Sequence, residues 1–164
     1  MTLFYLDTSA LLKRYRTELG SDCIESLFKE KLSKNQIATS FLAVIEMNGA
    51  VSRLRKSKAI TNQEADDILS YFGADMENRV EIIPITEQIL IQAVQISGTY
   101  GNRAADSIHA ATMVDLSIES GYTGASLVAL IADRRLCGTA EDKGISVLNP
   151  EENNALARLK GFLV

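Results

Sequence analysis

The sequence predicts an α/β fold, a three-layer α/β/α sandwich with a mainly parallel sheet, on three observations. Short apolar segments alternate along the chain with longer segments whose apolar residues recur at helical spacing. Leu127–Ala132 (LVALIA) is apolar throughout, as is typical of a strand that is covered on both faces. The apolar run Leu3–Leu6 ends in Asp7 and a helical pattern follows, which indicates a strand, a turn and a helix.

The first half of the chain is expected to form two strands and four helices. Lys34–Ser40 suits a brief strand because it is short and contains β-branched residues, and Ser40 would cap the next helix. Thr61 and Glu64 match a capping box. The expected elements are a strand over 3–6, helices over 8–16 and from 18 or 21 to about 33, a strand over 34–40, and helices over 41–56 and 61–78. The residues of 41–56 available to the core are Phe41, Val44, Ile45 and Val51.

The second half is expected to form three strands and four helices. Thr86 would cap a helix, and a segment rich in alanine after Arg103 would form a helix that approaches the sheet closely. Asp133 follows the apolar strand, and Pro150 stops the last strand. The expected elements are strands over 80–84, 127–132 and 145–148, and helices over 86–97, 103–119, 134–142 and the tail to 164, with a turn at 98–102 and a loop at 121–126.

Length and composition predict one folded domain over residues 1–164. Hydrophobic residues make up 46% and charged residues 23%, so disorder is not expected. A net charge of −4 argues against a protein held on nucleic acid by bulk positive charge, although divalent cations could offset a local cluster of acids. Cys23 and Cys137 are expected to be reduced thiols. No signal peptide or membrane-spanning run is visible, so we expect a soluble, cytoplasmic protein with no membrane partner.

Four acids stand at element boundaries or interrupt apolar helix faces. Asp7 and Asp133 each follow a strand and open a helix, at the sheet edge where parallel α/β proteins bind ligands. Glu46 interrupts an apolar helix, and Asp106 lies in the first turn of another. Singly, each acid has an ordinary role as a helix cap, a helix-dipole partner or a solvated side chain. Together in one cleft they would repel one another, and a pair of Mg²⁺ or Mn²⁺ ions would relieve that repulsion and support phosphoryl-transfer hydrolysis.

The segments that carry these acids resemble, in order, the four acidic motifs of PIN-domain ribonucleases, and the VapC-like toxins of toxin–antitoxin pairs in particular. The resemblance extends from Leu3 to Pro150. One residue departs from it, because many relatives carry a threonine or serine two residues before the last acid, where this chain has Ile131. The segments are YLDTSALLK, SFLAVIEMNGA, RAADSIHAATM and LIADRRLCGTAEDKGISVLNP.

The resemblance implies a metal-dependent endoribonuclease that leaves 5′-phosphate and 3′-hydroxyl ends. Asp7, Glu46, Asp106 and Asp133 become the catalytic and metal-binding acids, with Mg²⁺ or Mn²⁺ as cofactor. The partners would be an RNA substrate and a cognate antitoxin, and a homodimer is expected. His109 would be packed beside the site, and Thr8 and Ser9 would cap the first helix. The expected substrate contacts are Arg103, Arg134 and Ser40, whereas the basic run from Arg53 to Lys58 is interpreted as a solvated helix end.

Other readings remain open at this point. A DNA nuclease would use the same metal chemistry, and a PIN fold that has lost catalysis would act as a binding module. A receiver-like domain would place a phosphoacceptor aspartate at the end of a middle strand, but Val80–Pro84 ends in no acid. A haloacid-dehalogenase-type phosphatase would need a second aspartate two residues after the first, where Ser9 stands.

Overall fold

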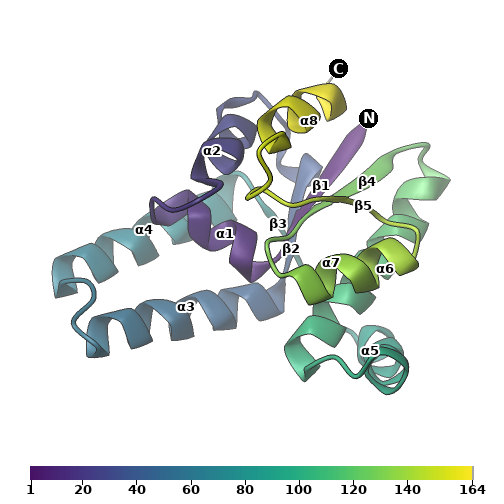
Figure 1. Ribbon diagram of the computed structural model, residues 1–164, viewed down its shortest axis with the longest axis horizontal. Coiled ribbons are helices and arrows are strands. Elements are labelled where there is room, and N and C mark those ends of the chain that lie inside the picture. The colour runs from purple at the N-terminus through teal and green to yellow at the C-terminus, as the bar shows by residue number, and fades with distance from the viewer. Residues whose placement is uncertain (164) are drawn as a thin grey trace.

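The computed structural model, which describes residues 1–163, has a five-stranded sheet in the order β3-β2-β1-β4-β5 (Figure 1). Every neighbouring pair of strands is parallel. The strands are β1 (Thr2–Leu6), β2 (Ile37–Ser40), β3 (Glu81–Ile83), β4 (Ser126–Leu130) and β5 (Ser146–Leu148). The helices are α1 (Thr8–Tyr15), α2 (Ser21–Lys29), α3 (Phe41–Lys56), α4 (Asn62–Asn78), α5 (Glu87–Tyr100), α6 (Ala104–Tyr122), α7 (Arg134–Asp142) and α8 (Ala155–Phe162), with a 3₁₀ turn at Lys34–Gln36.

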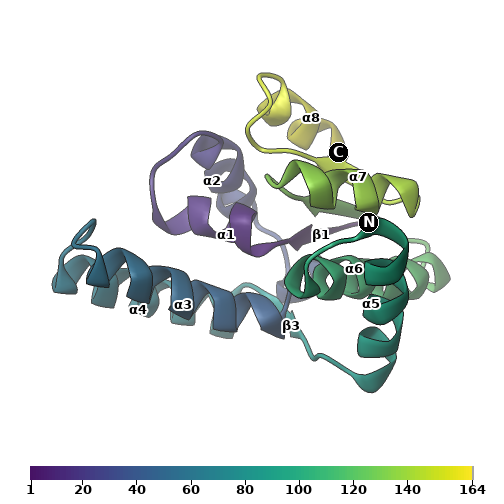
Figure 2. The same ribbon diagram turned by 60° about the horizontal axis from the view of Figure 1, so that its bottom comes forward.

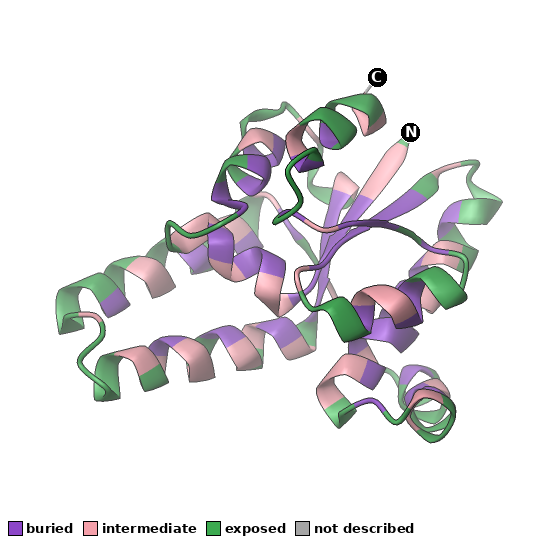
Figure 3. Ribbon diagram, in the orientation of Figure 1, coloured by how far each residue is buried: buried purple, intermediate pink, exposed green. Residues whose placement is uncertain are grey.

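Two apolar clusters cover the two faces of the sheet. Side chains alternate along each strand, so Phe4 and Leu6 pack with α1–α4 and α8, whereas Tyr5 packs with α5, α6 and α7. Figure 3 shows the buried strands between half-exposed helices. The predicted three-layer α/β/α sandwich with a parallel sheet is therefore confirmed.

Several predicted helix boundaries differ from those in the structure. The second helix ends at Lys29, four residues before the predicted end. At this end the Arg79 guanidinium donates to the carbonyl oxygens of Phe28 (2.6 Å) and Glu30 (3.3 Å). The helix expected to stop near residue 97 runs through Gly98 and ends at Gly101, whose positive φ of 66° is the left-handed conformation that closes many helices. The tail helix ends at Phe162, and residue 164 lies outside the described residues.

Phe41 and Ile45 were predicted to be available to the core but are 48% and 58% exposed. Val51 is buried and Val44 packs partly buried against the core, as predicted, and Ala43 and Met47 complete the buried face of α3. Figure 2 shows why, because α3 and α4 lie side by side and extend from the body of the molecule, so that α3 has neighbours on one side only. The capping box predicted for α4 is present: Thr61 Oγ1 accepts from the Glu64 backbone N–H (3.1 Å), and a Glu64 carboxylate oxygen accepts from the Thr61 backbone N–H (2.7 Å).

Gly20 holds the start of α2 against the loop after β5. Its φ is +85°, and a Cβ atom there would lie 2.6 Å from the Pro150 carbonyl oxygen. We therefore expect Gly20→Ala to lower the free energy of unfolding by about 2–4 kcal/mol. Gly73→Ala is the matched control, since Gly73 lies within α4 with no atom within 4 Å of its would-be Cβ, and we expect it to raise that free energy by about 0.5–1 kcal/mol. Urea unfolding measures both, and equal midpoints for Gly20→Ala and wild type would contradict the proposed close approach.

Cys23 and Cys137 are free thiols, as predicted, with Cys23 buried and Cys137 partly exposed. No helix within residues 1–163 combines the length and the apolar composition needed to span a membrane.

Candidate active site

The four predicted acids lie around the carboxyl edge of the sheet. The last residues of β1 and β4, Leu6 and Leu130, are register partners, and the backbone N–H of Asp7 donates to the Leu130 carbonyl oxygen (3.3 Å). Asp7 directly follows β1, and Asp133 lies three residues after the end of β4. α3, which carries Glu46, begins directly after the neighbouring strand β2. Two of the acids therefore share this edge through the sheet itself.

Asp7 is a buried carboxylate that caps α1. It is 4% exposed, and its Oδ1 atom accepts from the Ala10 backbone N–H (2.9 Å). The Ser9 hydroxyl lies 2.7–2.8 Å from both carboxylate oxygens and also accepts from the Ala132 backbone N–H (3.0 Å), so Ser9 joins α1 to the segment after β4. Burial raises the pKa of Asp7, although the charge of His109 and the hydrogen bonds from Ser9 and Ala10 act in the opposite direction. The site therefore holds a desolvated carboxylate whose negative charge is incompletely balanced.

Glu46 is joined to this end of β1 by a chain of hydrogen bonds. The Thr8 hydroxyl donates to Glu46 Oε2, and His109 Nε2 lies 2.9 Å from the same oxygen. The other ring nitrogen of His109, Nδ1, lies 2.6 Å from the Tyr5 hydroxyl. Burial alone would raise the pKa of Glu46, but the hydrogen bonds from His109 and Thr8 outweigh it and the net shift is downward.

The hydrogen-bond partners assign the His109 tautomer. An ionised Glu46 can only accept, so Nε2 must carry the proton that is donated to it. In the neutral form of the ring, Nδ1 then accepts from Tyr5. Burial and the charge of Asp7 raise the pKa of Tyr5 well above its ordinary value, so the phenol keeps its proton. His109 is buried, as predicted for a histidine packed beside the site, and its ring holds the Glu46 carboxylate in place.

This buried chain makes a testable contribution to stability. His109→Leu leaves the buried Tyr5 hydroxyl without its partner, and we expect it to lower the free energy of unfolding by about 1–3 kcal/mol. The double variant Tyr5→Phe/His109→Leu removes both polar groups, so we expect it to be more stable than His109→Leu alone. Urea unfolding of the three proteins decides this, and a double variant less stable than the single one would show that the pairing is misassigned.

Asp106 lies in the first turn of α6, one turn before His109. Burial and then the charge of Asp133 raise its pKa, Glu46 adds to the rise, and the charges of His109 and Arg103 oppose it. Acids from α3 and α7 therefore act electrostatically on an acid of α6. The charges of Asp133 and Glu46 thus both act on Asp106, in the direction expected of acids that face a common site.

Asp133 is exposed and caps α7, where its Oδ1 atom accepts from the backbone N–H groups of Arg135 (2.9 Å) and Leu136 (3.0 Å). Ile131, which stands where many relatives have a hydroxyl, is fully buried in the cluster beneath α5, α6 and α7. The Ser9 hydroxyl is hydrogen-bonded to this segment, because it accepts from the Ala132 backbone N–H. Ser9 therefore supplies the polar link that residue 131 lacks.

The donor chemistry of the site fits a hard divalent cation. Carboxylate oxygens are the ligands that Mg²⁺ and Mn²⁺ prefer, and the raised pKa values of Asp7 and Asp106 mark negative charge that a cation would stabilise. As they stand, no three His, Cys, Asp or Glu side chains within residues 1–163 are arranged to hold a metal ion. Glu46 is turned toward His109 and Thr8, and Asp133 toward its own helix, so a cation would have to draw these two side chains inward.

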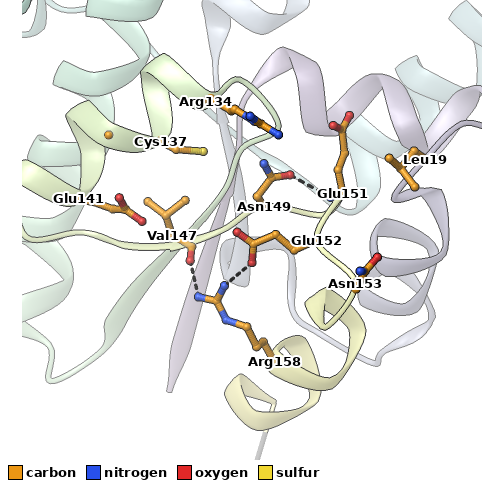
Figure 4. A pocket seen from close by; sticks show the side chains of 11 residues that line it. Leu19, Arg134, Cys137, Glu141, Val147, Asn149, Glu151, Glu152, Asn153 and Arg158 are labelled. Atoms are coloured by element: carbon orange, nitrogen blue, oxygen red, sulfur yellow. Dashed lines mark hydrogen bonds and ion pairs between the residues drawn. The ribbon is translucent and has the colours of Figure 1, made fainter.

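The three predicted substrate contacts differ in their surroundings. Arg103 is exposed at the start of α6, and its charge reaches Asp106. Arg134 is exposed beside Asp133 and lines a pocket of about 620 Å³ between α7 and the loop before α8, together with Glu141, Asn149 and Glu151 (Figure 4). Ser40 is fully buried and caps α3 by accepting from the Leu42 backbone N–H (3.3 Å). Its burial gives no support to a substrate contact, which stays a prediction.

Two further expectations about the first motif were wrong, namely that Thr8 and Ser9 would cap α1. Thr8 and Ser9 do not cap α1, because Asp7 does so itself. Their hydroxyls bind Glu46 and Asp7 instead, and Tyr5 joins the same network through His109. The sequence signal for Thr8 and Ser9 was their position directly after a strand-end carboxylate, within reach of a site at that edge. The contribution of Tyr5 could not be predicted in this way, because it depends on packing between the sheet and α6.

Comparisons with known proteins agree with this architecture. Residues 4–142 match the PIN domain family. Similar solved structures include FitAcB from Neisseria gonorrhoeae (TM-score 0.63, 19% identity, covering 90% of this chain and 98% of that one). They also include a toxin–antitoxin complex from Klebsiella pneumoniae (0.55, 15%, 90% and 98%) and VapBC2 from Rickettsia felis bound to a DNA fragment from their promoter (0.53, 16%, 89% and 97%).

At these identities the solved structures show a shared fold, and no curated protein matches the sequence. PIN domains are generally nucleases and typically use divalent metals. The family match covers most of the chain and includes all four acids from Asp7 to Asp133. This chain belongs to the PIN domain family.

Proposed function

We propose that this protein is a Mg²⁺- or Mn²⁺-dependent endoribonuclease and the toxin of a VapBC-type toxin–antitoxin pair. The observation that supports the proposal is the gathering of acids from separate elements at one edge of the sheet. Asp7 and Asp133 follow paired strands, and Glu46 accepts from the Thr8 hydroxyl beside Asp7. The charges of Asp133 and Glu46 both raise the pKa of Asp106, as is expected of acids that a hard cation would neutralise.

Asp7 and Asp106 would hold the principal cation, and Glu46 and Asp133 would complete a second position or contact it through water. When bound, such ions supply the Lewis acidity that hydrolysis of a phosphodiester bond needs. Ser9 fixes the orientation of the Asp7 carboxylate, and the chain from Tyr5 through His109 fixes that of Glu46. His109 Nε2 is occupied by Glu46, so His109 is not assigned a role in proton transfer. The family resemblance implies products with 5′-phosphate and 3′-hydroxyl ends.

The partners follow from the same family. An antitoxin would be expected to block the acidic edge, and the toxin–antitoxin complexes among the similar solved structures support this assignment. A homodimer would suit the exposed apolar residues Leu90, Ile91 and Val94 on α5, which form a surface that a second copy could cover. Arg103 and Arg134 remain the proposed phosphate contacts beside Asp106 and Asp133.

The test compares purified protein on single-stranded RNA and on duplex DNA, with Mg²⁺, with Mn²⁺ and with EDTA. We expect RNA to be cut with either ion and to stay intact with EDTA, and we expect the new 5′ ends to accept an adaptor that requires a 5′-phosphate. Duplex DNA that is cut while RNA stays intact would favour a PIN-fold DNA nuclease instead. RNA cleavage that persists in EDTA would contradict the proposed chemistry.

A further inference from the structure

Arg53 lies on the same face of α3 as Glu46, two turns further along the helix. Residues seven apart are separated by about 20° around an α-helix and by about 10 Å along it. Gly49 lies between them, and a Cβ atom there would come within 3.2 Å of Arg53 Nη1, with no other atom within 4 Å. The guanidinium group therefore folds back over Gly49, toward Glu46.

The charge of Arg53 is directed at the active site and is otherwise unpaired. Within residues 1–163 its guanidinium lies within 4.0 Å of no carboxylate oxygen, although the chain as a whole carries a net charge of −4. An anionic substrate that approaches four acids needs such a cation at the edge of the site.

The neighbouring basic residues are placed differently. Arg55 lies on the far side of α3 from Arg53, and its Nη1 atom is 4.0 Å from Asp66 of α4. Lys56 and Lys58 lie at the tip of the α3–α4 hairpin, beside a surface pocket that includes Thr61 and Glu64. Arg53 is exposed in the last turn of α3, as expected for a solvated helix end, but its side chain returns toward the catalytic acids.

We propose that Arg53 is a phosphate-binding residue for the RNA substrate and contacts a backbone phosphate on the Glu46 side of the one that is cut. The inference rests on the proposed function, to which it adds a substrate contact outside the acidic motifs. A guanidinium group suits this role because it is planar, always charged and able to donate two parallel hydrogen bonds to a phosphate. Gly49 supplies the space in which the guanidinium lies.

The first experiment measures RNA binding without cleavage. Each variant is placed in an Asp106→Asn background, and a short, fluorescein-labelled single-stranded RNA is titrated by anisotropy at several KCl concentrations. Arg53→Gln is expected to raise Kd about tenfold and to reduce the slope of log Kd against log salt by about 1, because one phosphate contact is lost. Arg55→Gln is the matched control, with the same charge change on the other side of the helix, and is expected to leave Kd and the slope unchanged.

Gly49→Ala separates binding from folding. An added methyl group favours the helix and is expected to raise Tm. The Arg53 guanidinium needs to shift by only a few tenths of an ångström, so Kd is expected to rise by less than in Arg53→Gln. In an Arg53→Gln background Gly49→Ala should have no further effect on Kd, since the group that it displaces is absent. A merely structural role for Gly49 would give additive effects.

The outcomes distinguish this inference from the proposed function. Equal Kd values for wild type and Arg53→Gln in the Asp106→Asn background would overturn it, even if RNA is still cut by the native protein. Arg53-dependent RNA binding by a protein that cuts no RNA would support the phosphate contact and refute the nuclease assignment. Equal effects of Arg53→Gln and Arg55→Gln would also overturn it, since they would show general attraction by the hairpin.

Discussion

Asp7→Asn is expected to reduce RNA cleavage by at least about 100-fold without unfolding the protein. The variant removes a charge from the proposed principal metal site but keeps a side-chain oxygen that can accept from the Ala10 backbone N–H and cap α1. Rates on a defined single-stranded RNA with saturating Mg²⁺ or Mn²⁺ measure the effect. Ser9 and the strand end stay in place, so circular dichroism should be unchanged.

Stability should change in the opposite direction to activity. Burial raises the pKa of Asp7, so the folded protein binds this proton more tightly than the unfolded chain does. The ionised carboxylate therefore lowers the free energy of unfolding above the unfolded-state pKa, and the penalty disappears as pH falls below that value. Asp7→Asn should accordingly have a Tm equal to or above that of wild type at pH 7, with a difference that narrows under acid conditions.

Two results would count against this account of Asp7. A variant that cuts RNA at the wild-type rate would remove Asp7 from catalysis. A variant that loses activity together with its fold, as seen by a large fall in Tm at pH 7, would show that Asp7 is structural and that its burial is well compensated.

Asp106→Asn is expected to release cells from growth arrest when the protein is expressed without an antitoxin. Asp106 carries the charge that Asp133 and Glu46 oppose, so its neutralisation weakens the attraction of the site for a cation. Asp115→Asn is the control, since Asp115 lies on the opposite side of the same helix from Asp106 and outside the site. Colony counts after induction, with matched protein levels by immunoblot, measure the difference.

Arrest by Asp106→Asn as strong as that by wild type would show that toxicity does not depend on the acidic edge. Relief by Asp115→Asn as well would attribute the effect to folding or expression. Relief by Asp106→Asn alone, with persistent arrest by Asp115→Asn, is the pattern that a catalytic toxin predicts.

The order of elements could be predicted because local signals were strong. The uninterrupted apolar run Leu127–Ala132 and the capping box at Thr61 left little choice of local structure, and α7 was predicted at Arg134–Asp142, where it is found. The errors occurred where a contact with a residue far along the chain, or a glycine with a positive φ, sets the end of a helix. Arg79 closes α2 from another part of the chain, and Gly101, with its positive φ, ends α5 rather than Gly98.

The sequence could nominate the acids of the candidate site but not the hydrogen-bond network around them. Strand-end position identified Asp7 and Asp133, and interrupted helix faces identified Glu46 and Asp106. No periodicity could show that Tyr5, on the face opposite to Phe4 and Leu6, would reach His109 on α6. The placement of Arg53 depends on the missing side chain at Gly49, whose significance appears only when the helix face is seen in three dimensions.

The central claim is that acids from separate elements act together to hold a divalent cation. Calorimetric titration of Mn²⁺ into wild type, Asp7→Asn, Asp106→Asn and Asp115→Asn tests it without any substrate. We expect saturable binding to wild type and to Asp115→Asn, and affinity at least about tenfold weaker in the other two variants. Mn²⁺ binding of the same strength in all four proteins, or in none, would contradict a metal site built from Asp7 and Asp106.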